Sequence, residues 1–112
     1  MTQLSHRRDY KAVHVRAVRR AFADALLVEL RRTSIARDKA AKSGGISRAF
    51  LQLLLKAKRQ TTIGTLISLA EGIGVQPEQL FGRTMRNLSQ IRAHVAEAPL
   101  SRFTSTWTKR LN

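Results

Sequence analysis

The sequence of 112 residues contains no cysteine, only two prolines and only seven acidic residues. Without cysteine there is neither a disulfide framework nor a zinc finger. The three histidines, His6, His14 and His94, are scattered and lack ligand spacing, so we expect no metal and no other cofactor. The carboxylates are equally scattered, and no glycine loop is built to cradle a phosphate. These absences argue against an enzyme.

Long apolar runs are also missing. No stretch is long and apolar enough to span a membrane or anchor in one, and the start MTQLSHRRDYKAV lacks the apolar segment of a signal peptide. We therefore expect a cytoplasmic protein without a membrane partner. The length fits one small domain with appended ends. No segment alternates long enough to build a sheet, so the sequence predicts an all-α fold.

Basic residues are abundant and unevenly placed. Lys and Arg number 21, the formal net charge is +14, and 43% of the residues are hydrophobic, which is too apolar for a disordered basic tail. Residues 31–59 hold nine basic side chains and one acid, Asp38, whereas residues 60–82 hold no Lys or Arg. A polyanion, nucleic acid before any other, is the expected partner. The alternative that this charge run is only a solvated face stays open.

Apolar spacing and capping residues predict six helices behind a flexible basic arm, which we place at residues 1–14. The first helix runs from about Val15 to Arg32. The others are a short second helix capped by Ser34, a third capped by Ser47 after the Gly44-Gly45 turn, a fourth capped by Thr61 or Thr62, a fifth starting at Pro77, and a sixth from Thr84 to Pro99. We expect their buried faces to include Leu51, Leu54, Ile63, Leu66, Ile67, Ala70, Ile73, Leu80 and Phe81.

One distributed pattern within residues 35–81 goes further than helix packing. It comprises Gly45-Ile46-Ser47, Leu51, Leu54, Thr65-Leu66, Leu69-Ala70, Gly74-Val75, Pro77-Glu78 and Leu80-Phe81. This pattern resembles the XRE-type, lambda-repressor-like helix-turn-helix family. The resemblance implies a five-helix DNA-binding domain, which we place at residues 15–82. The chain departs from the family at Leu55, Ala57 and Thr61, where Glu, Gly and Pro are usual, so the loop after the third helix is expected to differ in shape.

The resemblance also implies roles for individual residues. Four residues on the third helix would face base edges: Arg48, Ala49, Gln52 and Leu53. Their chemistry suits this role, because an Arg fork can take guanine O6 and N7 together and Gln can pair with adenine. Phosphate contacts are expected from Arg37, Lys56, Lys58 and Arg59, and from Arg7 and Arg8 of the arm. Ser47 is read as a helix cap rather than as a contact.

Residues 83–112 form the last predicted segment, a C-terminal helix and an aromatic tail. An apolar stripe, Met85, Leu88, Ile91 and Val95, either packs back onto the core or forms a symmetric dimer contact. Phe103 and Trp107 are expected to contact a partner subunit or another protein. The pattern leaves open whether the last thirteen residues, 100–112, form a helix, a strand or a loose tail.

Together these features predict a sequence-specific regulator of transcription, such as a repressor, that binds double-stranded DNA as a homodimer on palindromic operators. Two alternatives remain. One is an antitoxin-type autoregulator that binds a second protein through its C-terminal segment. The other is an interaction module or antiactivator that keeps the fold without reading DNA.

Overall fold

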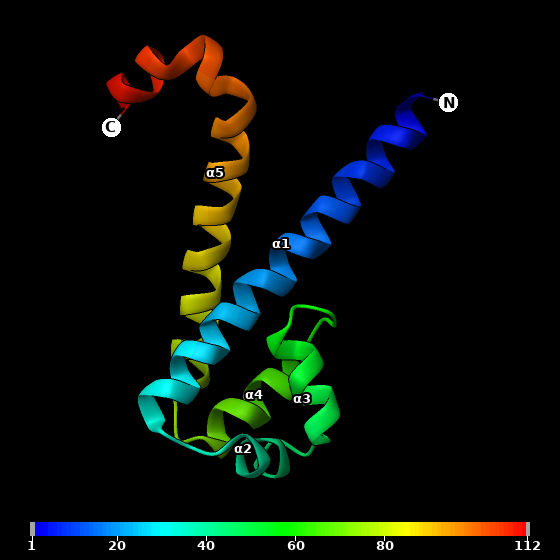
Figure 1. Ribbon diagram of the computed structural model, residues 1–112, viewed down its shortest axis with the longest axis vertical. Helices are drawn as coiled ribbons and strands as arrows, with labels where there is room; N and C mark the ends of the chain where they lie inside the picture. Colours follow the sequence, from blue (N-terminus) through cyan, green and yellow to red (C-terminus); the bar gives the residue numbers. More distant parts are fainter. Residues whose placement is uncertain (1, 112) are drawn as a thin grey trace.

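The computed structural model describes the backbone of residues 2–111 and the side chains of residues 11–94. Five helices follow one another: α1 (Thr2–Thr33), α2 (Arg37–Ser43), α3 (Arg48–Leu55), α4 (Ile63–Gly72) and α5 (Pro77–Leu111). The described backbone contains no strand, which confirms the expected all-α fold. The short helices α2, α3 and α4 gather at one end of the molecule, while the long helices α1 and α5 cross there and diverge toward the two termini (Figure 1).

The main core lies where all five helices meet. Its fully buried leucines come from four different helices: Leu26 of α1, Leu51 and Leu54 of α3, Leu69 of α4 and Leu80 of α5. The remaining helix, α2, contributes only the small side chains Ala40 and Ala41, which allow its backbone to approach the other helices closely. The expected burial of Leu51, Leu54, Leu66, Ala70, Ile73 and Leu80 is confirmed.

A second, smaller core joins α1 to α5. Ala17 and Ala21 of α1 and Leu88 of α5 are buried together, with Val18 and Ile91 packed against them. The two long helices share the most extensive contact in the fold, and the Asn87 side chain donates a hydrogen bond to the Ala21 carbonyl oxygen at 3.1 Å. This core fixes the start of α5 on α1, beyond the helix-turn-helix segment.

Three helix ends share one hydrogen-bond pattern, the Schellman motif, in which the residue after the cap adopts a left-handed backbone. In this position α2 has Gly45 (φ 70°), α3 has Ala57 (φ 58°) and α4 has Gly74 (φ 79°). At the end of α3 the Lys58 amide donates to the Leu53 carbonyl oxygen at 2.8 Å, as Ile46 and Val75 do for α2 and α4. The loop after α3 therefore has the shape that glycine favours, although the residue there is alanine.

The structure corrects two predicted caps. Thr84 does not start a sixth helix: its Oγ1 donates to the Leu80 carbonyl oxygen at 2.9 Å inside α5, and the side chain is buried. The predicted fifth and sixth helices are thus one helix, and α5 continues through Pro99 as well, with a change of direction in its orange portion (Figure 1). Ser34 does not cap α2 either. It has a left-handed backbone after α1, and the N-cap of α2 is Ala36, which makes no side-chain cap.

The expected arm is also different. The backbone of α1 is helical from Thr2, so residues 2–14 continue α1 instead of forming an irregular segment. The run of apolar spacing begins only at Val15, which is why pattern alone placed the helix start too late. Residues 100–111, whose structure the sequence left open, belong to α5.

Two sequence-predicted core positions of α4 and one of α5 are exposed. Ile63 is 67% exposed, Ile67 is 39% exposed and Phe81 is 44% exposed. They obey helical spacing, but they lie at the edge of the apolar stripe, where the described residues leave them partly open to solvent. No helix among the described residues is long and apolar enough to cross a membrane.

A buried carboxylate ties α1 to α5. Glu29 is fully buried, and its carboxylate accepts hydrogen bonds from Arg32 at 2.8 Å and from Arg83 at 3.0 Å, with Gln79 at 3.4 Å. Burial alone would raise the pKa of the Glu29 carboxyl, but the hydrogen bonds from Arg32 and Arg83 outweigh it and hold this pKa below its usual value. Helical spacing places Glu29 with the core residues of α1 and Arg32 one turn further on, but Gln79 and Arg83 lie 50 or more residues away. The spacing of residues in the sequence therefore does not reveal this cluster.

Candidate nucleic-acid interface

Helices α2 and α3 and the turn between them, residues 44–47, form a helix-turn-helix. The turn packs closely against α4, because a Cβ on Gly44 would lie 2.6 Å from Leu69 Cδ2 and would require the buried Leu69 side chain to shift. The next glycine, Gly45, takes the left-handed backbone that reverses the chain. Ser47 then caps α3, its Oγ accepting the Phe50 amide at 3.0 Å, as the sequence predicted.

The four predicted base-reading residues share the outer side of α3. Leu51 and Leu54 bury the inner side, and this burial turns Arg48 and Ala49 to solvent. Gln52 and Leu53, one turn later, are half-buried. The helix thus presents a cation, a small side chain, an amide and an aliphatic group on one exposed strip about two turns long. That is the set of groups that read base edges in a major groove.

Two side-chain bridges connect this strip to the first turn of α2. Arg48 Nη1 lies 2.8 Å from Asp38 Oδ1, and Arg37 Nη1 donates to Gln52 Oε1 at 3.4 Å. Both members of the Arg48–Asp38 pair remain more than 60% exposed, so solvent screens the pair and a ligand can reach the guanidinium. Arg48 is a cation in the first turn of a helix, where the dipole disfavours it, and Asp38 supplies the compensating charge.

The predicted phosphate-binding cations surround the strip. Arg37 is exposed at the start of α2, and Lys56, Lys58 and Arg59 are exposed where α3 ends and the connection to α4 begins. Cations at both ends of α3 are suited to bind the two backbones that border a groove. Arg7 and Arg8 also belong to this predicted set, but their side chains lie outside the described residues.

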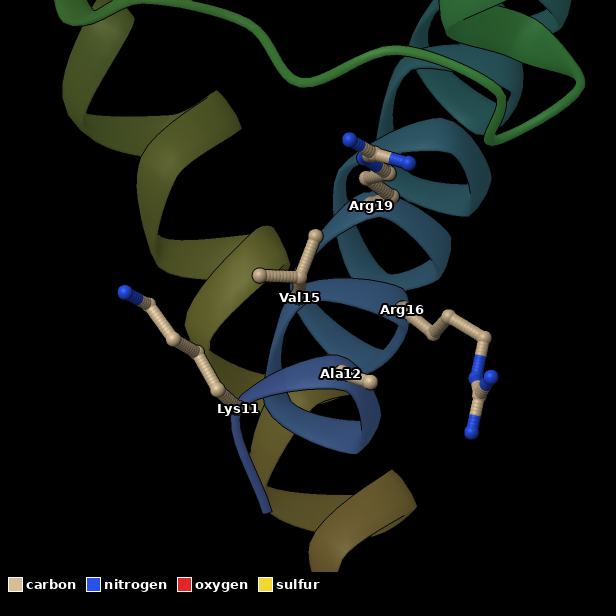
Figure 2. A pocket seen from close by; sticks show the side chains of 5 residues that line it. All are labelled: Lys11, Ala12, Val15, Arg16 and Arg19. Atoms are coloured by element: carbon tan, nitrogen blue, oxygen red, sulfur yellow. The ribbon is translucent and has the colours of Figure 1, made fainter. Parts of the chain in front are cut away.

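A basic hollow on α1 was not foreseen. It has a volume of about 430 Å³ and is lined by Lys11, Ala12, Val15, Arg16 and Arg19. Lys11 and Arg16 point to opposite sides of α1, and Arg19 extends in the direction of the connection between α3 and α4 (Figure 2). The Arg19 Nε is buried and has no hydrogen-bond partner among the described residues. The sequence shows these cations at helical spacing, but residues 1–14, which include Lys11, were expected to form a flexible arm.

The predicted dimer stripe divides in the structure. Leu88 is buried against α1 and Ile91 packs against the same cluster, so both serve the fold of one chain, the alternative that the sequence left open. Met85 remains 44% exposed. Val95, Phe103 and Trp107 lie outside the residues whose side chains are described. A dimer contact on this helix stays a prediction.

Sequence reasoning missed one residue of the interface itself. Asp38 was noted only as the single acid among residues 31–59, yet it contacts the main predicted base-reading side chain. The isolated negative charge in a basic segment was the available signal. Its partner could not be foreseen, because that depends on the angle between α2 and α3.

Comparison with known proteins shows the fold. No family model matches the sequence, and no curated protein matches it either. Among solved structures, the chain is similar to the clp gene regulator ClgR from Corynebacterium glutamicum, with a TM-score of 0.63 and 16% sequence identity. The similarity covers 81% of this chain and 93% of that chain. The chain therefore shares its all-α fold with a gene regulator.

Proposed function

We propose that this protein is a transcriptional regulator of the XRE-like helix-turn-helix type that binds double-stranded DNA sequence-specifically. In this proposal α3 enters the major groove and its exposed strip faces the base edges. We also propose that the protein binds as a homodimer to a palindromic operator, whose half-sites lie about one helical turn, or 10 base pairs, apart.

One observation carries the proposal. The exposed strip of α3 holds an Arg and a Gln, and each of these long side chains is held by a residue from the first turn of α2. Unlike the Arg20–Asp24 pair within α1, these bridges join two helices and fix long side chains of the predicted reading strip. Side chains that are already oriented lose less conformational freedom on binding, which supports a role in recognition.

The surrounding charge supports the same conclusion. The exposed cations Arg37, Lys56, Lys58 and Arg59 flank the strip, and Asp38 is the acid in contact with it. Phosphate contacts of this kind add affinity for every sequence, and base contacts by Arg48 and Gln52 would add selectivity. The fold shared with a gene regulator is consistent with this function.

The experiment that tests the proposal is binding to a duplex from the region upstream of its own gene, compared with a scrambled duplex across a salt series. We expect selective binding that survives moderate salt and weakens steadily as salt rises, because cations on the protein displace counterions. Equal binding to both duplexes would contradict sequence reading, and no binding at low salt would contradict the whole proposal.

The antitoxin-type alternative depends on the aromatic side chains Phe103 and Trp107, which lie outside the described residues. No described contact favours it over the proposal above.

A further inference from the structure

An apolar patch lies on α4 and α5 and, unlike the strip on α3, contains no basic side chain. It consists of Ile63 and Ile67 of α4 and Phe81 and Met85 of α5, all between 39% and 67% exposed. We call it the α4–α5 face. It continues into two hollows, one of about 220 Å³ beside Pro77 and Glu78, and one of about 240 Å³ that reaches toward Val18 of α1. Phe81, Ile63 and Leu66 line both hollows.

We propose that the α4–α5 face binds a second copy of this chain in a symmetric dimer whose two-fold axis passes close to Gly82. This inference rests on the proposed function, because it names the surface by which the proposed homodimer forms. A two-fold contact places the same patch of each copy against itself, so the patch must be complementary to itself. An exposed aromatic side chain beside apolar hollows meets that need, since Phe81 of each copy can enter a hollow of the other.

Charge selects this surface over the rest of the chain. With a net charge of +14, two copies repel each other across most of their surfaces. Residues 60–82 contain no Lys or Arg and carry Glu71 and Glu78, and they form α4 and the beginning of α5. Two copies can therefore approach here with the least repulsion, and apolar burial can then favour the dimer.

The charges along α5 are also self-complementary. Glu78 and Arg86 are both exposed, and Gly82 lies midway between them on the same side of the helix. If two α5 helices cross antiparallel near Gly82, Glu78 of each copy faces Arg86 of the other. Gly82 suits a crossing point because it has no side chain. Among the described residues the nearest atom to an added Cβ is Arg86 Nη1 at 3.5 Å, so a Cβ at this position would meet only a side chain of α5 itself.

Sedimentation of the full chain without DNA tests this dimer. We expect a concentration-dependent dimer in the unmodified protein. Glu78→Arg should weaken it about a hundredfold, because like charges then meet at two symmetry-related places in every dimer. Arg86→Glu should weaken it in the same way, and the double variant Glu78→Arg with Arg86→Glu should restore it. Asp24→Arg makes the same charge change at an exposed site on α1 and controls for net charge.

A cross-linking experiment places the axis independently. The chain has no cysteine, so a single Gly82→Cys variant can form a disulfide only between copies. Mild oxidation should give a covalent dimer rapidly, because the two Cα atoms would lie within disulfide range. Ala93→Cys, about 16 Å further along α5, should not cross-link at a comparable rate.

The outcomes are decisive in both directions. A monomer at all concentrations, equal weakening by Glu78→Arg and Asp24→Arg, or failure of the double variant to restore the dimer would each overturn the proposal. Because no DNA is present, such a failure is separate from any failure of DNA binding. Four of the substituted residues, Asp24, Glu78, Arg86 and Ala93, are exposed, and Gly82 is half-buried. Circular dichroism of each variant verifies that it folds.

Discussion

The guanidinium of Arg48 and the carboxylate of Asp38 meet at 2.8 Å on the exposed surface of the helix-turn-helix. The pair joins the first turn of α2 to the first turn of α3. Exposed ion pairs of this kind contribute about 0 to 1 kcal/mol to stability, so the pair matters little for folding. In the proposed complex the pair would fix where the guanidinium points and would keep a negative charge beside the DNA.

Replacing Asp38 by Ala should therefore separate affinity from selectivity. We expect tighter binding to a scrambled duplex, since one repulsive charge is lost, and a smaller preference for the operator, since Arg48 is no longer oriented. Asp24→Ala is a matched control because Asp24 also pairs with an arginine on an exposed surface, at 3.7 Å from Arg20. Binding curves for both duplexes measure the effect. An unchanged operator preference would show that Asp38 does not orient Arg48.

The roles assigned to the cations predict two different phenotypes. Arg48→Ala or Gln52→Ala should relax the choice of base at particular operator positions, with a loss of about 1 to 3 kcal/mol of discrimination each. Lys58→Ala or Arg59→Ala should weaken all duplexes alike and reduce the salt dependence. Competition binding with single-base operator variants measures both effects. Identical profiles for all four variants would contradict the assignment.

The left-handed backbone of Ala57 predicts a stabilising substitution. A residue with a Cβ pays for this conformation, and glycine does not, so Ala57→Gly should raise the free energy of unfolding by about 1 kcal/mol. The reverse change, Gly45→Ala, occurs at an equivalent helix end where an added Cβ would meet nothing within 4 Å. It should lower stability through the backbone alone. Urea unfolding of both variants measures the difference, and opposite signs are required.

Two glycines of α4 should respond oppositely to the same substitution. A Cβ on Gly72 would lie 2.5 Å from Ser43 Cβ at the end of α2, so Gly72→Ala should destabilise the fold by about 1 to 3 kcal/mol. A Cβ on Gly64 would meet only Thr62 Oγ1 at 3.8 Å, and Gly64→Ala should be stabilising by about 0.5 kcal/mol through helix propensity. Thermal unfolding compares them. Equal shifts would show that α2 and α4 can separate freely.

The Glu29 cluster predicts acid sensitivity. Because its pKa is lower in the folded chain, the carboxylate stabilises the fold fully above the ordinary glutamate value of about 4.3, and this stability is lost as the pH falls through the folded value. We expect Arg83→Ala to lower the free energy of unfolding by about 2 kcal/mol at neutral pH and to flatten its decline in acid. Denaturant unfolding from pH 7 to about pH 3 measures this dependence. An unchanged pH profile would exclude Arg83 as the stabilising partner.

The sequence predicted best what local chemistry decides. The Ser47 cap, the Gly45 turn and the buried Leu51 and Leu54 all follow from residue type and helical spacing, and these fix which side of α3 is exposed. It failed where a distant element competes. Thr84 was expected to cap a helix, but its neighbours on α5 pack against α1 and its hydroxyl bonds back to Leu80.

The expected loop shape after α3 was wrong for a related reason. Alanine at position 57 predicted a departure from the glycine-type turn, yet the hydrogen bonds from Ala57 and Lys58 to the last turn of α3 impose it. Asp38 and Glu29 could not be assigned a role from the sequence either, because each contacts a partner on a different helix.

The anchoring of α1 to α5 has a consequence for where the chain can be cut. A fragment ending at the predicted boundary after residue 82 would keep the whole helix-turn-helix but lose Arg83. The buried Glu29 carboxylate would keep its ion pair with Arg32 and, from α5, only the hydrogen bond from Gln79 at 3.4 Å. The same cut would remove Leu88 and bare Ala17 and Ala21 to water. The helix-turn-helix and the first turns of the long C-terminal helix therefore form one folding unit, and we expect a fragment able to fold on its own to extend at least to Ile91.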